Sequence, residues 1–309
     1  MQQRSLTSSR PPMSLPKQRM WLGLIFVSPW VIGFLIFKFL PIIASFVVSL
    51  TDFYALEPQA TQFIALENYF HVLRDRDAGG ALFFTLGTAL TAIPAQLLLA
   101  LGFATLLNSK RLRAKSLIRS LLFVPTIIPA TAIFIVALGF LDPNAGWLNV
   151  LILEPLGLPP YAGVFSEAGF NFFLMLLALW AVGPNFLIML GAMQSIPADL
   201  YEAARVDGAG PVYRFVKITV PLISPAIFFS LIVSLITVFG GAALLDQGAS
   251  FGDGTSAYDA YISQTIFSLS EYGYAAALAW AFFAVMLVVV IVLFRTSRYW
   301  VYYAEGEHL

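Results

Sequence analysis

Cysteine is absent from this chain, and charged residues are scarce. Only 11% of the 309 residues are charged, against about 25% in a soluble domain, and 59% are hydrophobic. Without cysteine there is no disulfide, thiol nucleophile or thiolate metal site, and two histidines, His71 and His308, argue against an imidazole site. We therefore expect no bound metal and a chain that lies in a lipid bilayer.

Several chemical motifs are also missing. No Gly-rich loop ends in Gly-Lys-Ser/Thr, so we expect no cofactor in this chain and no ATP bound by it. No Gly-x-Ser-x-Gly elbow, intramembrane carboxylate pair or His-Glu cluster is present, which argues against an enzyme and leaves no candidate catalytic residue. The zero net charge, with basic residues in short clusters, argues against a nucleic-acid partner.

What the chain has is long apolar runs. Six of them are long enough to cross a hydrocarbon core of roughly 30 Å, at about 21–43, 81–107, 117–141, 170–194, 221–245 and 273–294. The sequence thus predicts an all-α, polytopic membrane protein in which residues 20–295 form one transmembrane domain. Residues 52–80, 142–169 and 246–272 are predicted to be external loops, the first with an amphipathic helix near 66–73.

The lysines and arginines indicate orientation. Four lie in the N-terminal tail (1–19), five after the second predicted span, three after the fourth and two in or beside the C-terminal tail (296–309). In the predicted external loops only Arg74 and Arg76 are basic, and acidic residues alternate with them. Cytoplasmic loops carry an excess of Lys and Arg, so this distribution predicts that both termini and the loop 195–220 are cytoplasmic.

The loop 195–220 is polar yet keeps a helical pattern. Pro197 is suited to a helix start, with Asp199 and Glu202 near the positive end of the helix dipole. Gly208 predicts a stop in the left-handed conformation, and a second helix follows from Pro211. The pattern is therefore helix, tight turn, helix.

Each helix of this loop has a distinctive face. In the first, Leu200, Ala203, Ala204 and Asp207 share one face, which the alanines leave nearly flat and suited to docking. In the second, we expect Thr219 to lie on the membrane interface and Arg214 to point towards water.

The motif Glu202-Ala203-Ala204, with Gly208 four residues on, lies within IPADLYEAARVDGAG, which FVKITVP follows shortly afterwards. It resembles the signature loop of ABC importer permeases of the carbohydrate-uptake family, in the version of the maltose and glycerol-phosphate permeases. The resemblance implies the type I permease fold. It also implies a coupling helix that seats on a cytoplasmic ATPase through Leu200, Tyr201, Glu202, Ala203, Ala204, Asp207 and Gly208. The alternative is an ordinary amphipathic connector between two spans.

The same resemblance implies partners and a place in the cell. It implies a second homologous permease subunit, two ATPase subunits that bind ATP and Mg, and an extracytoplasmic sugar-binding protein, all at a prokaryotic cytoplasmic membrane. A polyol or glycerol phosphate is the alternative solute. An ion-coupled carrier or channel is a remoter alternative, because such carriers usually need ionisable residues at mid-membrane depth and these spans have essentially none beyond Lys38.

The resemblance also points to a substrate pathway on the spans beside the coupling loop, formed by Trp180, Asn185, Ser234, Thr237 and Gly241. A tryptophan face stacks on a sugar ring, and amide and hydroxyl groups exchange hydrogen bonds with its OH groups. The alternative is that these polar groups only join helices together. The chain departs from the family pattern in Asp246–Tyr272, where it reads DQGASFGDGTSAYDAYI in place of a Gly-Gly-Pro run.

Overall fold

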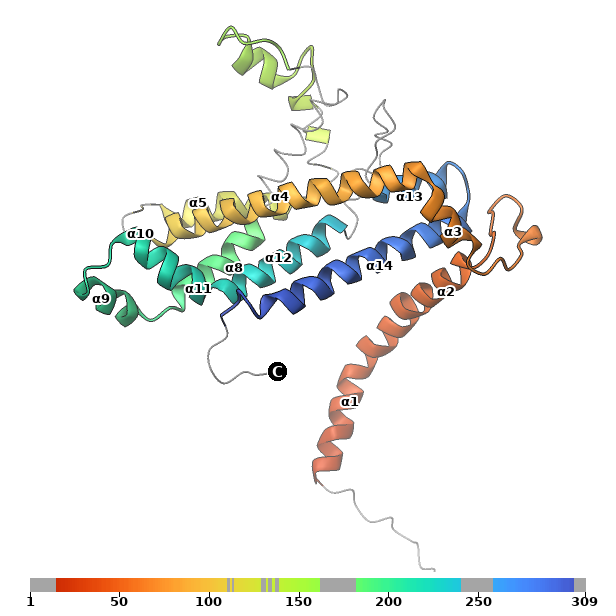
Figure 1. The fold of residues 1–309 in the computed structure, drawn as a ribbon, viewed down its shortest axis with the longest axis horizontal. Helices are drawn as coiled ribbons and strands as arrows, with labels where there is room; N and C mark the ends of the chain where they lie inside the picture. The colour runs from red at the N-terminus through yellow and green to blue at the C-terminus, as the bar shows by residue number, and fades with distance from the viewer. Residues whose placement is uncertain are drawn as a thin grey trace, which may run out of the picture.

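The computed structural model describes residues 15–109, 112, 114–128, 132, 135–136, 139–161, 182–239 and 258–302. Within these ranges the regular structure is helical, apart from two isolated β-bridges, Thr51 to Phe63 and Tyr54 to Glu271. The elements are α1 (Leu15–Phe34), η1 (Leu35–Phe39), α2 (Leu40–Ser49), η2 (Pro58–Ala60), α3 (Glu67–Arg74), α4 (Arg76–Asn108), α5 (Lys115–Phe123), η3 (Val124–Thr126), η4 (Asn149–Leu153), α8 (Gly183–Gln194), α9 (Ala198–Val206), α10 (Pro211–Arg214), η5 (Phe215–Thr219), α11 (Val220–Leu222), α12 (Ser224–Phe239), α13 (Tyr258–Phe267) and α14 (Tyr272–Ser297). Helices α4, α8, α12 and α14 form an elongated bundle, from which α1 diverges (Figure 1).

Three helical stretches are long and apolar enough to cross a membrane: Met20–Ser49, Arg76–Asn108 and Tyr272–Ser297. A fourth is possible if the pair Pro211–Leu222 and Ser224–Ile236, bent by 63°, counts as one span. Residues 129–131, 133–134 and 137–138 of the predicted third span and residues 170–181 of the predicted fourth lie outside the described residues. The helical class is thus confirmed, whereas the number of six spans stays a prediction.

Several predicted boundaries need correction. The first apolar stretch continues to Ser49 rather than ending at residue 43, and α4 begins at Arg76, five residues before the predicted start of the second span. The amphipathic helix predicted near 66–73 is confirmed as α3. The segment 246–272 is not only loop, because it contains α13. Tyr258 holds α13 in place: it is 2% exposed, its N–H donates to Thr85 Oγ1, and its ring stacks on Phe282.

Proline determines where the helices widen. The described residues include three π-helical turns, η1, η4 and η5, and each ends two residues before a proline: Pro41, Pro155 and Pro221. A proline has no N–H to donate, and its ring collides with the carbonyl group four residues earlier. A wider turn accommodates that carbonyl, and the residue before each proline donates its N–H five residues back, as Val220 does to Phe215.

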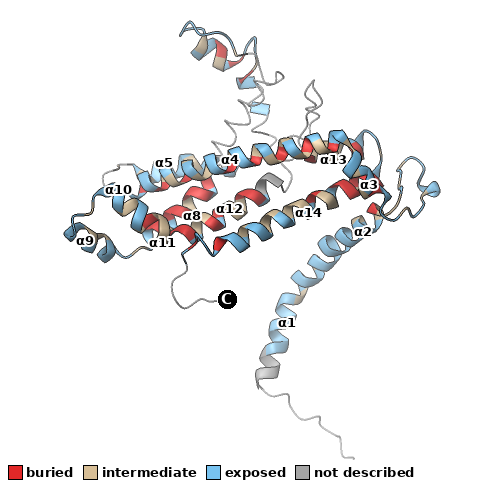
Figure 2. Ribbon diagram, viewed as in Figure 1, coloured by how far each residue is buried: buried red, intermediate tan, exposed pale blue. Residues whose placement is uncertain are grey.

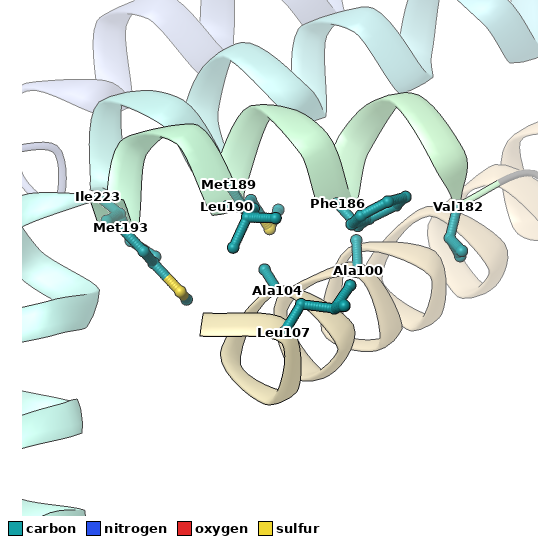
Figure 3. Close-up of a cluster of buried hydrophobic side chains, with 9 residues drawn as sticks. All are labelled: Ala100, Ala104, Leu107, Val182, Phe186, Met189, Leu190, Met193 and Ile223. Carbon is teal, nitrogen blue, oxygen red and sulfur yellow. The ribbon is translucent and has the colours of Figure 1, made fainter. Parts of the chain in front are cut away.

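The main buried cluster joins α4 to α8. Figure 3 shows Ala100, Ala104 and Leu107 of α4 facing Phe186 and Leu190 of α8, and each of these residues is at most 2% exposed. Met193 and the fully buried Ile223, which lies between α11 and α12, complete that end of the cluster. Alanines on one helix let the backbone of the other approach closely, which is the usual way in which helices associate in lipid.

The burial pattern suits lipid surroundings. None of the most apolar window of Met20–Ser49 is buried, and large side chains such as Phe26 and Trp30 are 85% and 70% exposed. Figure 2 shows α1 and α2 almost entirely in the exposed colour, whereas buried residues collect on the facing sides of the bundle helices. Apolar surface of this extent belongs against lipid or another chain.

At the end of the bundle formed by α3, α13 and the start of α14, one carboxylate holds the helices together. Asp75 accepts hydrogen bonds from the phenols of Tyr261 and Tyr274 and from the backbone N–H groups of Asp77 and Ala78. Burial alone would raise the pKa of Asp75, but these four donors together hold it below the ordinary value. One carboxylate thereby joins α4, α13 and α14.

Replacing this carboxylate should weaken the fold in a pH-dependent way. We expect Asp75→Asn to lower the free energy of unfolding by about 1 kcal/mol at neutral pH. A depressed folded-state pKa contributes stability that is complete above the unfolded-state value of about 3.8 and is lost as the pH falls through the folded-state value. The difference from wild type should therefore vanish in acid. Thermal melts of detergent-solubilised protein over a pH series measure this difference in stability, with Asp77→Asn as the control because Asp77 is exposed. A difference between Asp75→Asn and wild type that did not change with pH would contradict the role assigned to the Asp75 carboxylate.

Gly273 allows a close approach between two segments. A Cβ added there would lie 2.1 Å from the carbonyl oxygen of Thr51 and 2.9 Å from the nitrogen of Phe53. The Gly273 N–H donates to the Phe53 carbonyl at 3.0 Å. The first turn of α14 is thus held directly against the chain that follows α2, with no room for a side chain.

The substitution Gly273→Ala should lower the free energy of unfolding by about 1–3 kcal/mol, because the two backbones must move apart. Gly87→Ala in α4 is the matched control, since a Cβ there meets nothing within 4 Å. It should be neutral or stabilising by up to about 1 kcal/mol. Thermal melts of both variants measure this, and equal melting temperatures would contradict the close approach.

Candidate functional site

The helix predicted at the start of the loop 195–220 is present as α9, Ala198–Val206. Pro197 precedes it with an extended backbone (ψ 132°), so the predicted start near Pro197 is confirmed, although Pro197 is the capping residue rather than the first helical one. Asp199 lies in the first turn and Arg205 in the last. Both charges complement the helix dipole.

The end of α9 is a Schellman motif. Gly208 has φ +80°, the left-handed conformation that the sequence predicts. Its N–H donates to the Arg205 carbonyl at 3.1 Å, and the Ala209 N–H donates to the Ala204 carbonyl at 2.8 Å. These two bonds satisfy carbonyls that would otherwise end the helix unpaired, and they turn the chain sharply into α10.

The residues predicted for docking lie mainly on the surface of the chain. Leu200, Glu202, Ala203, Asp207 and Gly208 are exposed, whereas Tyr201 and Ala204 are half-buried, and α9 has no buried residue. Glu202 and Arg205 form an exposed ion pair of 3.8 Å. Figure 1 shows α9 at the tip of the bundle, projecting beyond α8 and α10. A helix so placed offers its surface to another molecule.

One side chain ties α9 to the following helices. The hydroxyl of Tyr201 lies 2.9 Å from Oγ1 of Thr219 in η5, within hydrogen-bonding distance. Thr219 is only 6% exposed, so the expectation that it lies on the membrane interface is wrong: it faces inward to meet Tyr201. Arg214 is likewise half-buried rather than pointing freely to water, and its Nε is buried.

Beyond η5 the chain bends by 63° between α11 and α12. Ile223, at the bend, is fully buried, and Ser224 opens α12 with 4% exposure. Pro225 has no N–H for the Pro221 carbonyl, and the Ser224 hydroxyl donates to that carbonyl instead, at 2.7 Å. The helical stretch from α10 to α12 therefore stays packed against the bundle at Ile223 and changes direction sharply there.

Two of the predicted pathway residues meet inside the bundle. Nδ2 of Asn185 on α8 donates to Oγ of Ser234 on α12 at 2.8 Å, and Ser234 Oγ lies 3.4 Å from Oε1 of Gln96 on α4. Asn185 and Ser234 are 4% and 3% exposed. The Asn185 Oδ1 has no hydrogen-bond partner among the described residues. Three helices are thus joined by one polar group each.

The other predicted pathway residues are less well placed. Trp180 and Gly241 lie outside the described residues, and Thr237 lies in α12 without a described side chain. Gln96 was not in the predicted set, although an amide in the apolar α4 is a signal for an inward-facing residue. Thr219 gave no such signal, because threonine is common on exposed helix faces.

Comparison with known proteins gives the class. Residues 92–303 match the family described as "Binding-protein-dependent transport system inner membrane component". The chain is 32% identical over 297 residues to the probable ABC transporter permease protein YesP of Bacillus subtilis, covering 92% of this chain and 93% of YesP. It is also 32% identical to the arabinooligosaccharides transport system permease protein AraP of the same species, over 93% of this chain and 95% of AraP.

A solved structure shares the fold. The crystal structure of a bacterial alginate ABC transporter, in complex with an alginate pentasaccharide-bound periplasmic protein, contains a chain with TM-score 0.74. Its sequence is 23% identical, and the alignment covers 92% of this chain and 96% of the other. The fold is therefore that of an ABC transporter membrane subunit. The chain belongs to the family of inner-membrane components of binding-protein-dependent transport systems, which makes it a membrane protein.

A double-mutant cycle measures the interaction energy between Asn185 and Ser234. We expect Asn185→Ala and Ser234→Ala each to destabilise the fold and to couple by about 0.6 kcal/mol, typical of an interhelical hydrogen bond in a membrane protein. Thermal or denaturant unfolding of the two single variants and the double variant gives the coupling energy. Strict additivity would mean that the two side chains do not interact.

Proposed function

We propose that this chain is a membrane-spanning permease subunit of an ATP-driven importer for a sugar or oligosaccharide, and that α9 is its contact with the ATPase. The observation that carries the proposal is α9 itself. It is an exposed helix without a buried residue, stopped by a left-handed Gly208 and joined to the bundle by the Tyr201–Thr219 contact. Family membership supports the transport role, and the saccharides named for AraP and the alginate transporter support the solute class.

The proposal includes an assembly. A second permease subunit completes the pathway, and two ATPase subunits bind ATP and Mg on the cytoplasmic side. An external binding protein delivers the solute, as the periplasmic protein in the alginate transporter complex suggests. Six spans with both termini in the cytoplasm remain the topology that best fits the positions of Lys and Arg.

Trp180, Asn185, Ser234, Thr237 and Gly241 remain the proposed pathway residues. The Asn185–Ser234 contact supports the idea that α8 and α12 present polar groups at one level of the bundle. The Oδ1 of Asn185 is an acceptor without a partner among the described residues, and a solute hydroxyl would pair with it if the pathway opened beside α8. If Trp180 lines the pathway, Trp180→Ala should lower uptake and leave assembly with the ATPase intact. If Trp180 only joins helices, the same substitution should lower both uptake and assembly.

Uptake by the complex reconstituted in proteoliposomes tests the proposed function. With the binding protein outside and ATP inside, labelled sugars, a polyol and glycerol 3-phosphate should be compared. We expect uptake of a saccharide that depends on ATP and on the ATPase subunit. Uptake driven by a sodium or proton gradient without ATP would contradict the proposal. A preference for glycerol 3-phosphate would show that the solute is not a saccharide.

The α9 contact is tested by its terminating glycine. Gly208→Val should cost about 1–2 kcal/mol of local backbone strain because a branched side chain is disfavoured at positive φ. The expected result is an inserted subunit whose complex loses the ATPase or hydrolyses ATP without uptake. Gly210→Ala is the matched control, since Gly210 has an ordinary φ of −69° and open space around it. Wild-type subunit content, ATP hydrolysis and uptake in Gly208→Val would contradict the role of α9.

A further inference from the structure

The residues after α14 lie against the bend between α11 and α12. Tyr302 donates its backbone N–H to Oγ of Ser224 at 2.7 Å, although 78 residues separate the two in sequence. Val301 beside it is 6% exposed and Ser224 4%. Figure 1 shows the end of α14 reaching the junction of α11 and α12. We call residues 299–302 the strap.

Aromatic rings hold the strap in the same place. The Trp300 ring meets the Phe228 ring of α12 edge to face, with centroids 5.6 Å apart, and Phe228 meets Phe294 of α14 at 5.0 Å. Within the strap, the Val301 N–H donates to the Ser297 carbonyl at 2.8 Å. The strap is therefore folded back by a hydrogen-bonded turn, and Trp300 packs on Phe228 of α12, which in turn packs on Phe294 of α14.

Ser224 uses its hydroxyl twice. It donates to the Pro221 carbonyl, which Pro225 cannot pair, and it accepts from Tyr302. The Pro221 carbonyl is thus satisfied at the bend by the same oxygen that anchors the strap. Proline at positions 221 and 225 removes two backbone donors, so the bend has fewer backbone hydrogen bonds than an unbroken helix, although the Ile223 N–H still donates to the Thr219 carbonyl and the Ile227 N–H to the Ile223 carbonyl.

The bend lies on the route from α9 to the bundle interior. Tyr201 of α9 contacts Thr219, four residues before Ile223 at the bend, and α12 beyond the bend holds Ser234 beside Asn185. A displacement of α9 reaches α12 only if α11 and α12 move as one body. A bend that flexes would absorb it instead.

We propose that the strap braces the bend between α11 and α12, and that Ser224 is a positioning residue through which displacement of α9 is transmitted to α12. The inference rests on the proposed function, because it assigns the strap a part in coupling ATP hydrolysis to transport. The Tyr302–Ser224 hydrogen bond and the packing of Phe228 between Trp300 of the strap and Phe294 of α14 hold the bend at one angle while α9 is displaced. Without the Tyr302–Ser224 hydrogen bond, the complex continues to hydrolyse ATP but imports less solute per ATP.

The test measures solute imported per ATP hydrolysed by the full complex in proteoliposomes. Ser224→Ala removes the acceptor, and Tyr302→Pro removes the donor. Tyr302→Ala keeps the backbone N–H and serves as the matched control. Thr296→Ala is a second control, because that exposed hydroxyl bonds only within α14. Loss of one hydrogen bond shifts a two-state population by about fivefold.

We expect Ser224→Ala and Tyr302→Pro to assemble normally, to keep ATP hydrolysis near the wild-type rate and to import about fivefold less solute per ATP. Both controls should match wild type. A wild-type ratio in Ser224→Ala and Tyr302→Pro overturns the inference. So does an equal loss of hydrolysis and uptake, or failed assembly, because the strap would then only hold the fold. A wild-type complex with no ATP-dependent uptake would instead contradict the proposed function itself, and the inference with it.

Discussion

The inability of proline to donate a backbone hydrogen bond shapes this chain more than any other single constraint. In lipid an unpaired carbonyl is costly, so a carbonyl that loses its usual donor to a proline favours another partner or another helical geometry. Before Pro41, Pro155 and Pro221 the remedy is a π-helical turn. At Pro225 it is the Ser224 hydroxyl, which pairs the Pro221 carbonyl. At these four prolines the helices therefore stay hydrogen-bonded while they widen and turn.

This constraint positions the functional loop. The widened turn η5 brings Thr219 inward, where Tyr201 of α9 meets it, and the bend after Pro221 directs α12 along the bundle beside α4 and α8. Helix α9 remains at the tip with its surface exposed, joined to the bundle by a contact at Tyr201 rather than by a buried face of its own. Such an element transmits force well when its joints are stiff, which is the role we propose for the strap.

Much of this architecture could be predicted from the sequence, because apolar periodicity and backbone chemistry are local. Gly208 and Pro211 predicted the helix, turn and helix of the coupling loop, and the apolar runs predicted α4 and α14 closely. The contacts between distant segments could not be predicted. Helix α13 was missed because the burial of Tyr258 depends on Thr85 and Phe282, and the inward position of Thr219 depends on Tyr201. Asn185 and Ser234 were selected by resemblance, and their mutual hydrogen bond became visible only with the helices in place.

The central claim is that the exposed surface of α9 is the contact with the ATPase. The chain has no cysteine, so a single engineered thiol can report its own surroundings. Ala203→Cys places one thiol on the exposed surface of α9, and Val288→Cys places a control thiol on α14 at a residue that is 60% exposed. After a photoactivated crosslinker is attached to the purified complex, the thiol at position 203 should capture the ATPase subunit and the thiol at position 288 should not. Capture from position 288 alone, or from neither position in an intact and active complex, would contradict the claim.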